Sequence, residues 1–144
     1  MQLKSEAFHN GDIIPKRYTA DAENISPPLS IENAPHDTKS FVLIVDDPDA
    51  PRGTFDHWII WNIPSTSTNL HEGFNLQSQG TNSYGYQVWN GPSPPPGKPH
   101  RYFFKLYALD ATLNLSKGAK KQAVEEAMEG HIIAKSELIG IYQR

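Results

Sequence analysis

Cysteine is absent from this chain of 144 residues. Its absence excludes disulfide bonds, thiolate nucleophiles and cysteine-ligated metal sites. An excess of positive charge is missing as well, because 13 Lys and Arg residues stand against 16 Asp and Glu residues and leave a formal net charge of −3. Nucleic-acid binding relies on clustered positive charge, so we expect no nucleic-acid partner.

Long apolar runs are also lacking. No stretch approaches the roughly 18 apolar residues of a transmembrane helix, so we expect no integral membrane association. The first residues, Met1–Glu6, contain no apolar run of the kind found in secretory signals. A cytoplasmic location fits these observations best, although a mature secreted chain has the same features.

The length and composition fit one domain that spans residues 1–144. Hydrophobic residues make up 38% of the chain and aromatic residues 10%. A chain of this length buries roughly two-thirds of its unfolded surface, which suffices for one core without disulfides or metals.

Proline is confined to the first hundred residues, and all 12 prolines lie at or before Pro99. An interior proline costs a helix ~3 kcal/mol or more, so this region favours short strands with proline-rich connections. The strongest strand candidates are Ser40–Val45, His57–Ile63 and Tyr102–Leu109, and weaker ones lie near Phe8, Ile13, Leu29 and Val88. The segment 40–45 is apolar at successive positions, as expected for a strand covered on both faces.

The pattern changes after Leu115. Apolar residues then recur at helical spacing, at Ala119, Ala123, Val124, Ala127 and Met128. Ser116 is the expected N-cap and Gly130 the expected C-terminal stop. A last strand is expected at 132–134 or 138–141, so the sequence predicts a mostly β domain with a C-terminal helix.

Four acidic residues follow the apolar strand closely: Asp46, Asp47, Asp49 and Asp56. Aspartate beside proline is common turn chemistry, so Asp47–Pro51 is interpreted first as a turn. Carboxylates at the end of a strand apolar on both faces also lie at the edge of a core, where charge needs a partner. This pattern alone leaves both a turn and a site open.

Two histidines lie at the beginning of apolar strands. A single histidine in such a place is more often structural than ligand-binding. His57 and His100 together, with the carboxylates at the end of a third strand, form a candidate site. We expect the two rings to converge, with Asp47 or Asp49 in contact with one of them.

The proline-rich segment Asn90–Pro99 directly precedes His100. It is either a polyproline ligand for another protein or an ordered wall of a pocket. Aromatic segments at 84–89 and 102–107 flank it and favour the wall, with Pro94–Gly97 ordered and packed. Its glycines allow close approach to a ligand, but neither phosphate-binding motif, GxxxxGK[ST] or GxGxxG, is present.

These residues resemble the signature segments of the phosphatidylethanolamine-binding proteins, also called the Raf-kinase-inhibitor-like family. The resemblance rests on Asp47–Pro51, on His57-Trp58 with Asn62–Pro64, and on Gly91–Tyr102. It runs from about Phe8 to Tyr142 and is similar to the prokaryotic branch. Eukaryotic members often have a second histidine where this chain has Asp56.

The resemblance implies a β-sandwich with a large central sheet and a small anion pocket at one end of it. Residue by residue, it implies that the ligand-binding residues are Asp47, Asp49, His57, Pro94, Pro95, His100 and Tyr102. It also implies a cis peptide bond between Ala50 and Pro51.

The expected function is binding of a small anionic or phosphorylated ligand, without a cofactor and without catalysis. An imidazole that donates to Asp47 or Asp49 has a raised pKa and, as imidazolium, donates strongly to a phosphate or carboxylate. A ligand ammonium group would meet the remaining carboxylate, and Tyr102 would add a hydroxyl donor. Anion affinity would then fall above neutral pH, or at lower pH where burial dominates the pKa of the ring.

Two other functions stay open at this point. The two histidines and two aspartates would suit a metal-dependent hydrolase, although HExxH is missing and no GxSxG elbow offers a serine nucleophile. The chain would otherwise regulate a kinase or protease partner through its surface, with the pocket as a switch. A homodimer is also open.

Overall fold

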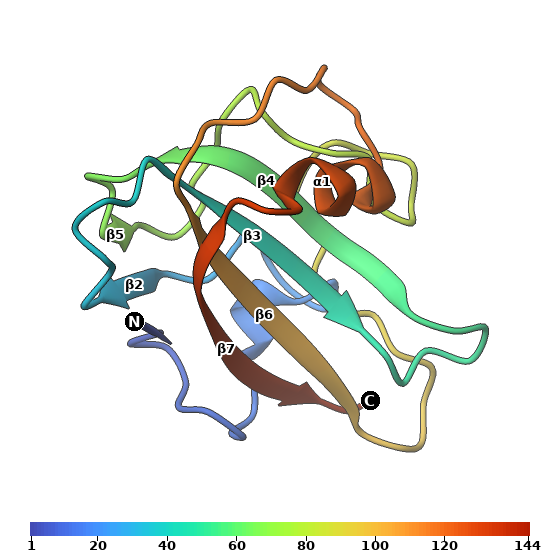
Figure 1. The fold of residues 1–144 in the computed structure, drawn as a ribbon. Coiled ribbons are helices and arrows are strands. Elements are labelled where there is room, and N and C mark those ends of the chain that lie inside the picture. Colours follow the sequence, from blue (N-terminus) through green and yellow to red (C-terminus); the bar gives the residue numbers. More distant parts are fainter.

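Two antiparallel β-sheets and one α-helix make up the computed structural model, which describes residues 1–144 (Figure 1). The larger sheet has the order β4-β3-β6-β7, with β4 at Phe55–Pro64, β3 at Ser40–Asp47, β6 at His100–Leu109 and β7 at Ile132–Tyr142. The smaller sheet has the order β1-β2-β5, with β1 at Gln2–Lys4, β2 at Leu29–Glu32 and β5 at Asn69–Leu70. Helix α1 spans Lys121–Met128, and a short 3-10 helix spans Lys16–Tyr18. The predicted mostly β architecture is confirmed.

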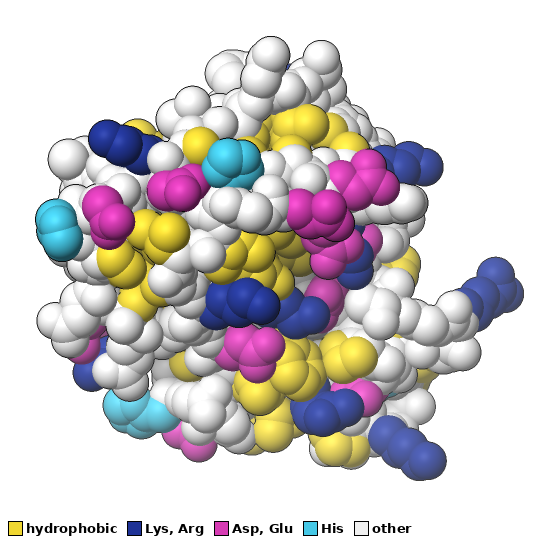
Figure 2. Space-filling model, in the orientation of Figure 1, with side chains coloured by type: hydrophobic (Ala, Val, Ile, Leu, Met, Phe, Trp, Pro, Cys, Tyr) yellow, Lys and Arg dark blue, Asp and Glu magenta, His cyan; other side chains and the backbone are white.

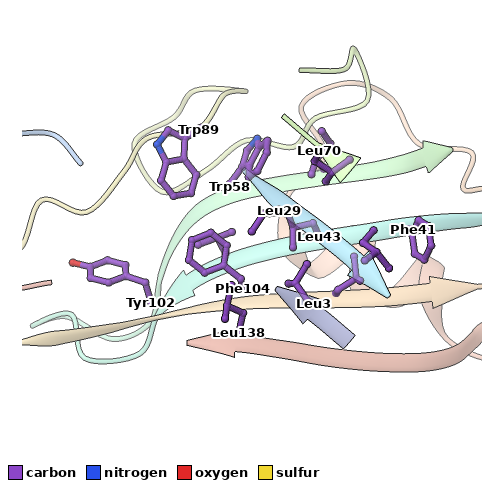
Figure 3. Packing of buried hydrophobic residues seen from close by; sticks show 14 of the residues in the cluster. Leu3, Leu29, Phe41, Leu43, Trp58, Leu70, Trp89, Tyr102, Phe104 and Leu138 are labelled. Carbon is purple, nitrogen blue, oxygen red and sulfur yellow. The ribbon is translucent and has the colours of Figure 1, made fainter. Parts of the chain in front are cut away.

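Strand β3 lies inside the larger sheet, and all of its residues are buried. Phe41, Leu43 and Val45 belong to the larger hydrophobic cluster, which fills the space between the two sheets (Figure 3). Val42 and Ile44 belong to a smaller cluster on the opposite face, against α1. The prediction of a strand covered on both faces is therefore confirmed.

The other strand predictions have mixed outcomes. The three strong candidates form β3, β4 and β6, and the weaker candidate at Leu29 forms β2. Phe8 and Val88 lie outside all strands, and Ile13 forms only an isolated bridge with Ile141. The two alternatives for the last strand are both parts of β7, which runs without interruption from 132 to 142.

Helix α1 is shorter than predicted at its N-terminus. It begins at Lys121, and Ser116 is not its N-cap. The preceding backbone pairs instead with the segment 79–81, because Gly118 N donates to Gln79 O at 2.8 Å and Thr81 N donates to Ala119 O at 3.0 Å. Gly130 follows the helix with a positive φ of 80°, as its predicted role as a stop requires.

The outer face of the larger sheet, which α1 covers in part, carries charges of both signs. Figure 2 shows Lys and Arg side chains next to Asp and Glu side chains on this side of the molecule. Lys105 pairs with Asp46 at 3.0 Å, and Lys121 pairs with Asp56 at 2.7 Å. No helix of the molecule has the length and apolarity of a membrane span.

Candidate functional site

Strand β3 ends, and β4 and β6 begin, at the same end of the larger sheet (Figure 1). A cavity of about 160 Å³ lies at this end. It is lined by Asp47, Ala50, Pro51, Phe55, His57, Tyr84, Ser93, Pro94, Pro95, His100 and Tyr102. Six of the seven predicted site residues are among these, and Asp49 is the exception. Pockets for drug-sized ligands measure roughly 300–1,000 Å³, so this one suits an ion or a small head group.

The buried pair Asp47–His100 forms the floor of the cavity. His100 Nδ1 lies 2.6 Å from Asp47 Oδ2, and the two side chains are only 8% and 4% exposed. The other carboxylate oxygen accepts a hydrogen bond from the backbone N–H of Asp49 at 2.7 Å. Because the carboxylate can only accept, Nδ1 of the ring carries the proton and Nε2 is left for another partner. The predicted contact between an aspartate and one of the rings is confirmed.

His57 faces the same cavity but hydrogen bonds to a carbonyl. Its Nδ1 donates to Asn90 O at 2.6 Å, and its ring lies 5.3 Å from the ring of Tyr102. Burial lowers the pKa of His57 below its usual value, and this outweighs the opposite influences of the Asn90 carbonyl and the Asp47 carboxylate. The carboxylate acts to raise the pKa as expected, but burial dominates, which is the second of the two outcomes that the sequence left open for the pKa of this ring.

A β-bulge turns His57 toward the cavity. Val45 of β3 pairs with Trp58 of β4, but the next residue of β3, Asp46, pairs with Asp56. His57, between the two β4 residues, therefore has no partner of its own in β3. Strict alternation would place His57 on the face of Ile59, against α1. The bulge instead directs its ring to the face of Trp58, between the sheets, where the Tyr102 ring lies.

The proline-rich segment 90–99, called the proline wall below, is bound by donors from other parts of the chain, because prolines have no N–H to donate to a strand pairing. Ala20 N donates to Pro92 O at 3.0 Å, and Arg144 Nη1 donates to Pro94 O at 3.3 Å. Asp21 orients that arginine by accepting from its Nε at 3.0 Å and from its Nη2 at 2.7 Å. Pro94 is buried, while Pro95 at the cavity mouth and the next two residues, Pro96 and Gly97, are exposed, so the predicted packing of the segment 94–97 holds only for its inner residue.

Asp49 lies beside the cavity and acts as a tether. Its carboxylate accepts from Arg101 Nε and Nη2, both at 2.9 Å, and from the Arg101 backbone N–H at 3.0 Å. The hydrogen bonds from Arg101 are the main reason that the pKa of Asp49 is lowered to about 2. Asp49 thus fixes the turn after β3 to the start of β6.

The family model for the phosphatidylethanolamine-binding protein matches residues 4–143. A UPF0098 protein of the archaeon Methanothermobacter thermautotrophicus is 50% identical over 100% of this chain and 99% of its own length. The crystal structure of a putative phosphatidylethanolamine-binding protein homologue from Chlamydia trachomatis is 44% identical, with a TM-score of 0.95 over 99% of this chain and 97% of that one. E. coli YbcL, described as a member of the mammalian family, has 30% identity and a TM-score of 0.91 over 99% of this chain and 98% of its own.

The chain belongs to the phosphatidylethanolamine-binding protein family. The resemblance seen in the signature segments is therefore confirmed, and relatives are found in archaea and bacteria. The two solved structures also confirm the predicted fold.

One feature that the family resemblance implies is not present in this member. The structure contains no cis peptide bond, so the Ala50–Pro51 bond is trans and the expectation is corrected. The trans form of an X–Pro bond is favoured by roughly 0.5–1 kcal/mol. The chain reverses here through a turn in which Gly53 N donates to Ala50 O at 3.2 Å, with Gly53 at a φ of 106°.

The loop 83–89 supplies a cavity residue that the sequence analysis did not select. Tyr84 lines the cavity and packs edge-on against Phe55 at 4.7 Å between ring centroids. The buried Asn82 holds this loop, because its Oδ1 accepts from the N–H groups of Tyr84 and Tyr86 and its Nδ2 donates to Val88 O at 2.9 Å. Asparagine and glycine in the segment 82–85 signal a turn, but they do not reveal which distant strand it meets.

The metal-dependent alternative requires more ligands than the cavity brings together. No group of three or more His, Asp or Glu side chains in the molecule converges to hold a metal ion. Asp47 and His100 pair with each other, while His57 Nδ1 is taken by a backbone carbonyl. The predicted set of two histidines and two aspartates is incomplete because Asp49 binds Arg101.

Proposed function

We propose that this protein binds a small oxyanion, such as phosphate or a phosphorylated head group, between His57 and His100, without catalysing a reaction. The observation that carries this proposal is that two buried imidazoles line one small cavity. Each ring donates its Nδ1 proton to a protein acceptor, which leaves Nε2 of both rings without a protein partner. A proton taken up at Nε2 turns this atom from an acceptor into a charged donor, and such donors suit the several oxygens of a phosphate group.

The charges in the cavity fit an anion once one ring takes up a proton. The negative charge of Asp47 lies against His100, so this pair supplies no net positive charge for an anion. A proton on His57 adds the positive charge that an oxyanion needs. Burial raises the pKa of Tyr102 far above its usual value, so its hydroxyl stays protonated and can donate to the ligand.

His57→Gln is expected to weaken phosphate binding about 10-fold at pH 6. Glutamine keeps a donor but loses the charge, and the difference between a charged and a neutral hydrogen bond is about 1–2 kcal/mol. Calorimetric titration with inorganic phosphate and with O-phosphoethanolamine measures the change. His131→Gln is the matched control, because His131 is a surface histidine paired with Asp110 outside the cavity. Equal affinities of wild type and His57→Gln would contradict the proposal.

Anion affinity is expected to rise as the pH falls through values below about 6.5, the ordinary pKa of histidine. Burial lowers the pKa of His57, so near pH 7 the ring is neutral and anion binding must take up a proton. Sulfate is the suitable probe, because its charge stays constant from pH 5 to 8. Calorimetry at pH 7 in two buffers of different ionisation enthalpy should show this proton uptake.

The same pKa change makes a prediction for the free protein. Above pH 6.5 His57 is neutral in both the folded and the unfolded chain, so it has no effect on the pH dependence of stability there. Below pH 6.5 the unfolded chain takes up the proton first, and stability falls. Sulfate should offset this loss in thermal unfolding, and a sulfate affinity that is constant between pH 5 and 8 would contradict the mechanism.

A further inference from the structure

The cavity is lined by polar side chains at its floor and by mostly apolar side chains at its mouth. The charged and imidazole groups lie deep, with Asp47 and His57 each 3% exposed and His100 7% exposed. The residues at the mouth are apolar: Pro51 and Pro95 are exposed, Tyr84 is 43% exposed, and Phe55 is half-buried. A ligand seated on the floor therefore has its next atoms among aromatic and proline side chains.

The two aromatic residues of this mouth are fixed by contacts with each other and with neighbouring residues. The rings of Phe55 and Tyr84 meet edge-on, and Phe55 also lies 5.0 Å from the ring of His57. Because Asn82 binds the loop through backbone groups, the position of Tyr84 does not depend on its own hydroxyl. A rigid aromatic side chain loses little conformational entropy when it contacts a ligand.

Charged groups that would favour a hydrophilic ligand are absent from the loop. The segment 83–89 contains no charged residue. Arg101 forms a salt bridge with Asp49, and Arg144 forms one with Asp21. Apart from Asp47, the two histidines and Tyr102, the cavity lining offers only the hydroxyl groups of Ser93 and Tyr84 as polar side-chain groups. A sugar phosphate or a polyphosphate would therefore place most of its hydroxyl or phosphate groups against apolar surface, where they gain no partners.

We propose that the mouth formed by Phe55, Tyr84, Pro51 and Pro95 is a subsite for an apolar, preferably aromatic, group bonded directly to the oxyanion. This proposal rests on the proposed function and narrows it from phosphates in general to aryl and alkyl phosphates. Glycerol phosphates and phosphoethanolamine, whose phosphate neighbours are hydrophilic, fit the mouth less well.

The test compares phosphates that differ only in the attached group. Phenyl phosphate is expected to bind about 5-fold more tightly than inorganic phosphate, the scale of an aromatic contact, whereas glycerol 3-phosphate and O-phosphoethanolamine gain nothing. The affinity ratio of phenyl phosphate to inorganic phosphate is the readout, because it cancels changes on the floor of the cavity. Calorimetry at pH 6 gives both affinities for each protein.

Tyr84→Ser and Phe55→Leu are each expected to reduce this ratio towards 1. Tyr86→Ser is the matched control, because Tyr86 belongs to the same loop and is 61% exposed but does not line the cavity, so its ratio should equal that of wild type. Phosphate binding with no preference for phenyl phosphate, or a ratio that Tyr84→Ser leaves unchanged, overturns this proposal alone. Absence of binding by every phosphate tested overturns the proposed function as well.

Discussion

Asp47→Ala is expected to lower the free energy of unfolding by about 3 kcal/mol and to abolish oxyanion binding. The carboxylate is buried and accepts from His100 Nδ1 at 2.6 Å and from the Asp49 N–H at 2.7 Å. Removal of the carboxylate leaves two N–H donors without their acceptor, His100 Nδ1 and the Asp49 backbone, and each unsatisfied buried donor costs roughly 1–3 kcal/mol. Urea-induced unfolding at pH 7 measures the loss, and phosphate calorimetry measures the binding.

Asp110→Ala is the matched control for this experiment. Asp110 contacts His131 at 2.8 Å, nearly the same distance, but both side chains are about half exposed. Exposed pairs contribute roughly 0–1 kcal/mol, so this variant should remain close to wild type in stability. Similar losses for the two variants would show that burial does not give the Asp47–His100 pair its importance.

The strands were predictable because their determinants are local. β3 is apolar at successive positions, and a strand inside a sheet with a cluster on each face requires that pattern. In β6, alternation placed His100 and Tyr102 on one face, and both are buried there. Helix α1 was less predictable at its beginning, because the bonds of Gly118 and Ala119 to the segment 79–81 prevent an earlier start.

The site was predictable as a set of residues but not as a set of contacts. Asp47 and Asp49 are two positions apart, and the sequence offered either one as the partner of a histidine. In the structure Asp47 turns inward to His100 and Asp49 turns outward to Arg101, a choice that depends on the turn after β3. The direction of the His57 ring depends on a bulge, which the pairing of β3 with β4 creates.

The direction of the pKa shift of His57 was also not predictable from the sequence. Asp56 and the aspartates after β3 are near His57 in the sequence pattern, and nearby carboxylates raise the pKa of a histidine. Its depth in the folded protein has the larger effect and lowers the pKa instead. Burial is a property of the assembled sheets and loops, so this sign could be obtained only from the structure.

Gly91→Ala is the second substitution for which we expect a large effect, a loss of about 3 kcal/mol in stability together with loss of anion affinity. A Cβ at this position would overlap the carbonyl oxygen of Tyr18 and approach Asn24 Oδ1 to 2.6 Å. Tyr18 O is a backbone atom and cannot rotate away, so the chain itself must move, and forced overpacking typically costs roughly 1–3 kcal/mol or more. The movement would also strain the hydrogen bond from Gly91 N to Asn24 Oδ1, which anchors the start of the proline wall.

Gly130→Ala separates this steric effect from the ordinary cost of replacing glycine. Gly130 has a φ of 80° and open space around it, so alanine there should cost only about 1 kcal/mol of backbone strain and should leave the cavity intact. Thermal unfolding gives the stability of both variants, and phosphate calorimetry gives the affinity. If Gly91→Ala binds phosphate as well as Gly130→Ala does, the wall formed by Pro94 and Pro95 does not shape the anion site, and the two imidazoles on the cavity floor would have to hold the ligand without it.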